Sequence, residues 1–105
     1  MKKVMQEIDK FNKERDWDKF HSPENLAKSI AIESGELLEC FLWDGKNYNL
    51  EDVKDELADV LNNCLQLAMK LNLDPEEIIL RKMEKNKKKY PVEKSKGQSL
   101  KYDRL

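Results

Sequence analysis

Two pairs of carboxylates at helical spacing are the residues whose types and positions in this chain could do chemistry. Glu33 and Glu36 form the first pair, and Glu56 and Asp59 form the second. Side chains three residues apart project from one face of an α-helix, so each pair can point at one object. Between the pairs lies D-G-K-N-Y-N, a turn-rich break that would let two helices fold back as an antiparallel hairpin. We therefore expect four carboxylates to share one small volume.

The angular position of Glu33 supports this expectation more strongly than spacing does. At about 100° per residue, Glu33 lies within an apolar helical face. That face consists of Leu26, Ile30, Leu37, Cys40 and Phe41. Glu36 falls at the edge of the face and Glu39 further round, which favours Glu33 with Glu36 over the alternative pair of Glu36 with Glu39. On the second expected helix, Glu56 borders the apolar stripe, and the acids line a seam.

Crowded carboxylates on an apolar face need a compensating partner. An uncompensated buried carboxylate costs several kcal/mol and neighbouring carboxylates repel one another. Protons, lysines or a cation could neutralise such a cluster. Oxygen ligands without nearby His or Cys suit Mg²⁺, which usually keeps waters and binds substrate phosphates as well. The alternative is that these are ordinary solvated helix positions in a chain that is 39% charged.

The remaining pattern predicts an all-α fold in a single domain of residues 1–105. Apolar periodicity and capping residues predict four main helices and an extended C-terminal tail. Their ranges are about 2–14, 23–43, 49–71 and 75–89, with the tail at 90–105. A chain of 105 residues buries a modest core, so we expect a helix bundle that is completed by oligomerisation, as a homodimer or homotetramer.

Composition excludes several other classes of protein and site. No apolar run approaches the roughly 18 residues of a membrane span, and the N-terminus lacks the apolar stretch of a signal peptide, so we expect a cytoplasmic protein with no membrane partner. His21 is the only histidine, which excludes a Glu-x-x-His di-iron bundle and argues against a His-centred triad. Cys40 and Cys64 fall on or near apolar faces, and we expect both to be reduced core residues.

The C-terminal quarter of the chain is basic although the net charge is only −1. Half of the basic residues lie there: Arg81, Lys82, Lys85, Lys87, Lys88, Lys89, Lys94, Lys96, Lys101 and Arg104. They could contact substrate phosphates, bind RNA or form a solvated helix face. Glu84, Glu93 and Asp103 interrupt the basic residues, and this interruption argues against a nucleic-acid partner.

The acidic motif and its flanks resemble one known family. Glu33-x-x-Glu36, a spacer and Glu56-x-x-Asp59 are similar to the signature of the MazG-like all-α nucleoside triphosphate pyrophosphohydrolases, and the dCTP pyrophosphatase-type subgroup looks most similar. The flanks agree as well: F-N-K-E-R-D-W-D-K-F-H-S-P-E-N-L before the first pair, F-L-W after it, and K-M-E-K-N-K-K-K-Y-P with a late K-Y near the end. The resemblance therefore extends over nearly the whole chain.

The resemblance implies Mg²⁺-dependent hydrolysis of a nucleoside triphosphate to the monophosphate and pyrophosphate, as in sanitation of the nucleotide pool. By the same resemblance the metal ligands are Glu33, Glu36, Glu56 and Asp59. The implied substrate contacts are Trp17, His21 and Trp43 for base and sugar, Asn63 as a polar pocket residue, and Lys82, Asn86 and Tyr102 for phosphate or substrate. Asn63 departs from the family pattern, which has an aromatic residue at the matching helical position.

Phosphoryl transfer needs charge compensation on the phosphate oxygens and a water oriented for in-line attack. We interpret Glu36, at the edge of the apolar face beside Gly35, as the catalytic acid that orients or deprotonates this water. Two other classes of function remain open at this point. One is a dimerisation module that kept the fold without the chemistry, although all four acids are present, and the other is a helical nucleic-acid-binding module.

Overall fold

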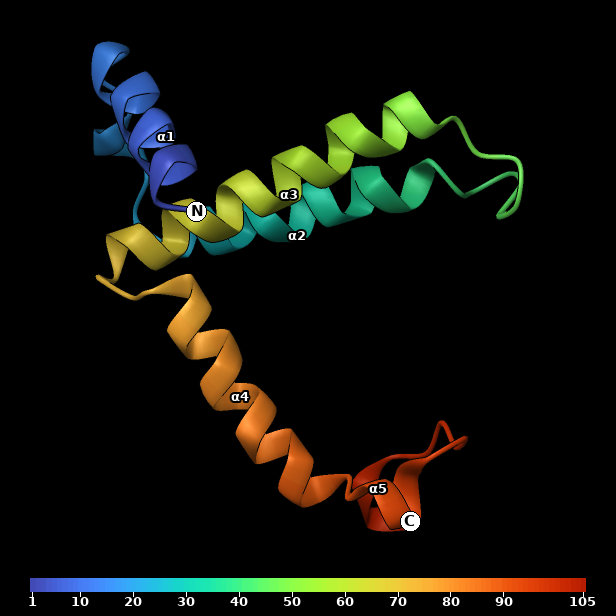
Figure 1. Cartoon of the computed structure of the whole chain (residues 1–105). Helices are drawn as coiled ribbons and strands as arrows, with labels where there is room; N and C mark the ends of the chain where they lie inside the picture. The colour runs from blue at the N-terminus through green and yellow to red at the C-terminus, as the bar shows by residue number, and fades with distance from the viewer. The chain divides into compact units, whose positions relative to one another are not determined.

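The computed structural model describes all 105 residues, and all of its regular secondary structure is helical (Figure 1). The elements are α1 (Lys2–Glu14), η1 (Asp18–Phe20), α2 (Pro23–Glu39), α3 (Leu50–Lys70), α4 (Pro75–Lys89), α5 (Val92–Ser95) and η2 (Tyr102–Arg104), where η denotes a 3₁₀-helix. The prediction of an all-α fold with four main helices is confirmed. No helix is both long enough and apolar enough to span a membrane.

Three of the main helices begin at side chains that cap their first turn. The hydroxyl of Ser22 accepts a hydrogen bond from the backbone N–H of Asn25 at 3.1 Å, and proline follows at the first helical position of α2. The side chains of Asn49 and Asp74 each accept from two backbone N–H groups at the starts of α3 and α4. Each cap satisfies donors that have no partner within the helix, which fixes where the helix begins.

Residues 1–72 form one compact unit, in which α2 and α3 run side by side as an antiparallel hairpin and α1 packs on α3 (Figure 1). The hairpin loop is organised by Asp44, whose carboxylate accepts from the backbone N–H groups of Lys46 at 2.9 Å and Asn47 at 3.1 Å. These hydrogen bonds lower the pKa of Asp44. The prediction of a hairpin with a turn between the two acidic pairs is therefore confirmed.

The second helix ends earlier than its sequence predicted. We expected it to continue to about Trp43, but α2 ends at Glu39. The next three backbone N–H groups, those of residues 40 to 42, donate to carbonyls three residues back, which is the pattern of a tightened last turn. The turn around Asp44 follows directly, so the chain reverses before another α-helical turn can form.

Residues 73–105 form a second compact unit, which contains α4, α5 and η2. Tyr90 and Tyr102 meet edge to face with ring centroids 6.2 Å apart. The ammonium group of Lys89 lies 4.9 Å from the ring centroid of Tyr102, within the range of a cation–π interaction. Residues 90–105, which we expected to be an extended tail, contain two short helical turns, and the contacts of Tyr102 hold the second of these turns against the end of α4.

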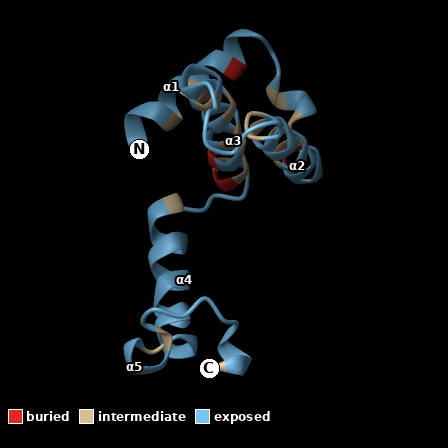
Figure 2. Ribbon diagram, turned by 90° about the vertical axis from the view of Figure 1, so that its right-hand side faces the viewer, coloured by how far each residue is buried: buried red, intermediate tan, exposed pale blue.

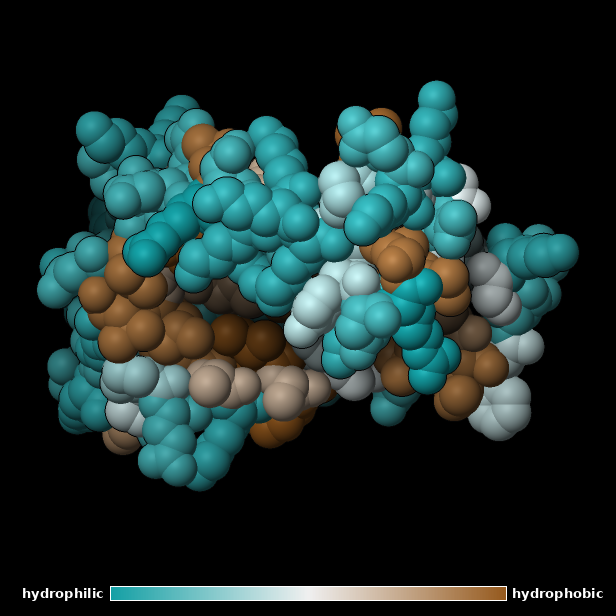
Figure 3. All heavy atoms as spheres, turned by 90° about the horizontal axis from the view of Figure 1, so that it is seen from below, coloured by the Kyte–Doolittle hydropathy of each residue, from teal (hydrophilic) through white to brown (hydrophobic).

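The apolar core of the single chain is small. Only Leu26, Leu65 and Ala68 are buried apolar residues, and most of the ribbon is exposed in Figure 2. Large apolar side chains remain at the surface instead, such as Leu61 at 52% and Ile79 at 58% exposed, and apolar side chains also reach the face seen in Figure 3. Large exposed apolar patches on a monomeric protein mark interaction sites, whereas single exposed apolar residues are ordinary. The isolated chain thus leaves apolar faces without a cover.

Candidate active site

Three carboxylates from the two helices of the hairpin converge. Glu33 comes from α2, and Glu56 and Asp59 come from α3; one oxygen of each lies within 4.8 Å of the others. Glu33 and Glu56 are half-buried, whereas Asp59 is exposed. The hairpin produces this arrangement because α2 packs along α3, which brings the Glu33 carboxylate beside those of Glu56 and Asp59. The structure therefore brings together three of the four acids that we predicted as metal ligands.

Glu36, the fourth predicted acid, is exposed but lies close enough to act on both half-buried glutamates. A hydrogen bond with Glu36, together with burial and repulsion from neighbouring carboxylates, raises the pKa of Glu33. Burial, followed by repulsion from Glu36 and a hydrogen bond with it, raises the pKa of Glu56. The cluster therefore opposes its own ionisation, as closely spaced carboxylates do.

The donor set of this cluster fits a hard divalent cation. One oxygen of Glu33 and one of Glu56, both Oε2, are buried without a hydrogen-bond partner. The ion pairs of the chain all involve other acids, so no lysine or arginine is paired with Glu33, Glu36, Glu56 or Asp59. Of the three possible means of neutralisation, only protons or a cation remain. Carboxylate oxygens alone suit Mg²⁺ or a similar ion.

A cavity of about 460 Å³ adjoins the acids. It is lined by Glu7, Ile8, Phe11, Asn12, Trp17, His21, Glu33, Asp59, Asn62, Asn63 and Gln66. Among these residues, Trp17 packs edge to face against Phe11, with ring centroids 5.6 Å apart. The buried Nδ1 atom of His21 has no hydrogen-bond partner. The structure therefore gathers Trp17, His21 and Asn63, which we predicted as substrate contacts, around one cavity that also contains two of the acids.

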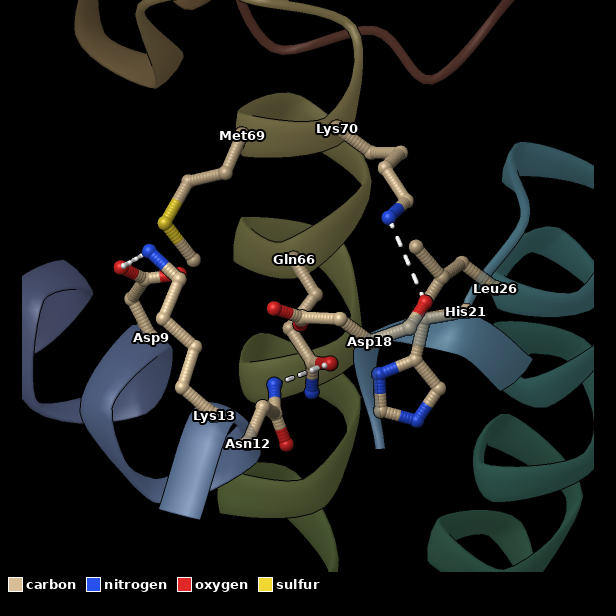
Figure 4. Close-up of a pocket in the computed structure, with 9 residues that line it drawn as sticks. All are labelled: Asp9, Asn12, Lys13, Asp18, His21, Leu26, Gln66, Met69 and Lys70. Atoms are coloured by element: carbon tan, nitrogen blue, oxygen red, sulfur yellow. Dashed lines mark hydrogen bonds and ion pairs between the residues drawn. The ribbon is translucent and has the colours of Figure 1, made fainter. Parts of the chain in front are cut away.

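A second cavity, of about 260 Å³, shares part of its wall with the first. Figure 4 shows its lining residues, which include the shared residues Asn12, His21 and Gln66. Lys13 donates to Asp9 at 2.8 Å, and Lys70 donates to the backbone oxygen of Asp18 at 3.4 Å (Figure 4). The hydrogen bond with Asp9 raises the pKa of Lys13. Each cation here already has a partner within the chain.

Three further residues that the sequence pattern did not predict also line the larger cavity: Asn12, Asn62 and Gln66. The side chain of Asn12 is 5% exposed and donates to Oε1 of Gln66 at 2.9 Å, across 54 positions in sequence. Part of the signal was present in the sequence, since Asn62 and Gln66 follow Asp59 at helical spacings of three and seven residues. Nothing local indicated that Asn12 would meet them, because that depends on how α1 packs on α3.

Four other predicted site residues lie apart from these cavities or in the second unit. Trp43 is 94% exposed, in the loop that follows α2, and lines neither cavity. Lys82 and Asn86 are exposed on α4, and Tyr102 lies in η2 against Tyr90. The substrate roles of these four residues stay predictions.

Comparison with known proteins agrees with the fold and with the acidic cluster. The sequence profile of the MazG-like family matches residues 28–105, which include all four acids. The chain belongs to the MazG-like family. This membership confirms the resemblance drawn from the two Glu-x-x-acid pairs and their flanks.

Relatives of this MazG-like chain include two mammalian enzymes and one archaeal protein of known structure. It is 35% identical to dCTP pyrophosphatase 1 of Mus musculus and 36% identical to that of Homo sapiens, in each case over 104 residues that cover 90% of this chain and 61% of the relative. The chain thus spans about three fifths of the length of these relatives. It is also similar to a pyrophosphatase from Archaeoglobus fulgidus, with 40% identity and a TM-score of 0.77, over 87% of this chain and 92% of that one.

Replacing both half-buried acids, as Glu33→Gln with Glu56→Gln, should stabilise the metal-free protein above about pH 4. The folded state raises both pKa values, so it holds these protons more tightly than the unfolded chain does. The resulting stability is present below the ordinary glutamate pKa of about 4.3 and is lost as pH rises through the raised values. The melting temperature of the double variant minus that of wild type should therefore increase as the pH rises from about 4 through the raised pKa values of Glu33 and Glu56.

Near neutral pH, Mg²⁺ should raise the melting temperature of wild type more than that of the Glu33→Gln, Glu56→Gln double variant. The difference in melting temperature between the two proteins should therefore become smaller when Mg²⁺ is added. Glu39→Gln is a matched control, since Glu39 is an exposed glutamate of the same helix outside the cluster. An equal effect of Mg²⁺ on wild type and double variant would contradict a metal site at these residues.

Proposed function

We propose that this MazG-like protein hydrolyses a deoxynucleoside triphosphate to the monophosphate and pyrophosphate in a Mg²⁺-dependent reaction at the hairpin. The observation that carries the proposal is the set of three carboxylate oxygens within 4.8 Å of one another, beside a cavity of about 460 Å³ that an aromatic side chain lines. The names of the relatives support the same reaction class. The corresponding role is removal of unwanted nucleotides from the cytoplasmic pool.

Glu33, Glu56 and Asp59 are the proposed ligands of the cation, because they supply the three converging oxygens. Mg²⁺ held by these residues would compensate negative charge on the phosphate oxygens, which favours cleavage of the α–β phosphoanhydride. Oε2 of Glu33 and of Glu56 would then gain the partner that each lacks within the chain. Glu36 completes the acidic set but lies at its exposed side.

Glu36 is the proposed catalytic residue because it is exposed and, unlike the exposed Asp59, is not one of the three converging ligands. The Glu36 side chain is exposed to solvent and lies next to two half-buried acids. Its carboxylate can therefore orient a water molecule towards phosphorus and accept a proton from that water. The oxygen of that water bonds to phosphorus while the bridging oxygen leaves with the pyrophosphate. A half-buried ligand such as Glu33 is less suited to this task, because its Oε2 atom is buried.

Substrate contacts are proposed in both units of the chain. In the first unit, Trp17 offers an aromatic surface, and His21 and Asn63 offer hydrogen-bonding groups at the same cavity. Tryptophan can stack on a base, an interaction worth about 1–3 kcal/mol per base in nucleic-acid complexes. The remaining proposed contacts rest on the family pattern: Trp43 for the base or sugar, and Lys82, Asn86 and Tyr102 for phosphate or substrate.

A homodimer or homotetramer is the proposed assembly. Leu57 and Leu61 lie four residues apart on α3 and are 43% and 52% exposed. On α4, Ile78, Ile79 and Met83 are exposed as well. With only three buried apolar residues in the chain, a second copy is the most direct cover for these faces.

Purified protein incubated with Mg²⁺ and each of a panel of canonical and modified deoxynucleoside triphosphates should release monophosphate and pyrophosphate in equal amounts. An excess of EDTA should abolish the release, because the acids alone repel the triphosphate. Products are separated by chromatography and quantified. Salt-dependent binding to nucleic acid without turnover of any nucleotide would favour a nucleic-acid-binding module instead.

Glu36→Gln should lower kcat by about 10²-fold or more while changing KM little, since the amide keeps the shape but cannot take up a proton. Steady-state kinetics with the best substrate of the panel measure both constants. Glu39→Gln, in the next turn of the same helix, is the matched control and should leave both unchanged. Normal turnover by the Glu36 variant would remove that residue from the catalytic role.

Leu61→Glu should reduce the molar mass in solution, because a charge would replace an apolar side chain at the proposed contact between copies. Sedimentation equilibrium over a range of concentrations measures the change. Leu61→Met keeps an apolar group of similar volume and should retain the wild-type mass. A monomeric wild type at all concentrations would rule out the proposed assembly.

A further inference from the structure

A chain of three carboxamides crosses the wall of the cavity that contains the acids. Nδ2 of Asn12 donates to Oε1 of Gln66 at 2.9 Å, and Nε2 of Gln66 donates to Oδ1 of Asn62 at 2.8 Å. Asn12 is 5% exposed, so the first of these three carboxamides lies in the protein interior. All three side chains line the cavity of about 460 Å³ that also contains Glu33 and Asp59. We call these three residues the amide chain.

The amide chain lies at a defined distance from the acids. Asp59 and Gln66 are separated by seven residues of α3, which corresponds to two helical turns, one face of the helix and about 10 Å along its axis. A nucleotide with its phosphates at the acids would extend from there into the cavity. Along that direction it would meet the amides of Asn62 and Gln66, with the aromatic pair of Phe11 and Trp17 lining the same cavity.

Gln66, the middle member, still has hydrogen-bonding capacity for a ligand. Its amide uses one of two N–H groups towards Asn62 and one of two lone pairs towards Asn12. One N–H group of Nε2 and one lone pair of Oε1 remain, on neighbouring atoms of the same amide. The edge of a nucleobase also presents adjacent groups: an amino donor beside a ring-nitrogen acceptor in cytosine, and a carbonyl acceptor beside a ring N–H donor in uracil. The orientation of the Gln66 amide therefore decides which of these two edges is complementary.

This orientation can reverse without loss of a hydrogen bond. If all three carboxamides turn over together, Asn62 donates to Gln66 and Gln66 donates to Asn12, so both bonds are remade in the opposite direction. The oxygen and nitrogen of a carboxamide have nearly the same shape, so the packing of the cavity wall hardly changes. A carboxylate in place of either asparagine would prevent the reversal, because it can only accept.

We propose that Gln66 reads the edge of the base and that reversal of the amide chain lets one cavity accept both cytosine-type and uracil-type nucleotides. The inference rests on the proposed function, since the ligand must be a nucleotide with its phosphates at the acids. It adds the substrate class to that function: pyrimidine nucleotides of both hydrogen-bonding patterns, with weak discrimination between them. Discrimination between cytosine and uracil is weak because the amides of Asn12 and Asn62 can turn over together with that of Gln66, so either base finds a complementary amide.

Two variants that add the same charge but impose opposite orientations test the proposal. In Asn62→Asp the new carboxylate must accept from Nε2 of Gln66, which is the orientation in the structure. In Asn12→Asp the new carboxylate must accept from that same group, which is the reversed orientation. The measurement is kcat/KM for dCTP divided by kcat/KM for dUTP. This ratio cancels effects on the metal, because both substrates share the sugar and the triphosphate.

Wild type should give a ratio within about tenfold of one, and the two variants should shift it in opposite directions, each by about tenfold, which is the effect of losing about one hydrogen bond to the base. Asn62→Ala is the control, since it imposes no orientation and should leave the ratio near that of wild type. A shift in the same direction for both carboxylate variants, or no shift in either, would overturn the proposal.

Two further measurements keep the outcome decisive. Asn12 is buried, so Asn12→Asp could fail to fold, which circular dichroism and thermal unfolding would reveal. In that case the exposed position 62 decides alone: a shift for Asn62→Asp without one for Asn62→Ala supports the proposal, and equal ratios overturn it. Dissociation constants of dCMP and dUMP from calorimetry give the same ratio without turnover. A shift in the ratio of dissociation constants without any release of pyrophosphate would support base recognition by the amide chain and refute the proposed hydrolysis.

Discussion

Repulsion among carboxylates at the α2–α3 seam is the constraint on which the rest of the structure depends. A hydrogen bond with Glu36, burial and repulsion raise the pKa of Glu33, and burial and repulsion raise that of Glu56. No lysine or arginine forms an ion pair with these acids. The packing that joins the two helices therefore also brings like charges together. A bound cation would turn this repulsion into attraction, so metal binding and stability of the hairpin are linked through the same side chains. A fold that only needed a stable hairpin would place apolar residues at these positions.

The position of the core shows how the hairpin tolerates this repulsion. Leu26 lies near the start of α2, whereas Leu65 and Ala68 lie near the end of α3, so the antiparallel arrangement brings the three buried apolar residues to the same end of the hairpin. At the other end, next to the loop, Phe41 and Tyr48 pack with ring centroids 4.9 Å apart. The acids lie between these two apolar regions. Contacts on both sides can hold the helices in place while the middle of the seam stays polar, open to the cavity and free to bind a charged ligand.

How far the sequence predicts this protein depends on whether the determining contacts are local. Helix starts were predictable because Ser22, Asn49 and Asp74 cap helices through backbone groups within three residues of themselves. The convergence of Glu33, Glu56 and Asp59 was predictable because Glu33 interrupts an otherwise apolar face and a turn separates the two acidic pairs. The end of α2 was not predictable from its own residues, because it depends on a turn further along the chain that Asp44 stabilises. The contact between Asn12 and Gln66 was not predictable either, because neither residue is unusual within its own helix and only the packing of α1 on α3 joins them.

The two ends of the cavity differ in kind, and this difference bears on specificity in the proposed reaction. At the acidic end, the proposed interaction with a metal-bound triphosphate would be the same for every nucleotide, so it would contribute to affinity without distinguishing bases. At the other end the groups are uncharged amides, each of whose hydrogen bonds contributes about 1 kcal/mol. Strict selection among bases requires a buried donor or acceptor that a wrong base leaves unpaired. Asn12, Gln66 and Asn62 contain no such fixed group, since each amide supplies both a donor and an acceptor. An active site built in this way selects for the triphosphate first and for the base only weakly, which suits an enzyme that acts on several nucleotides rather than on one.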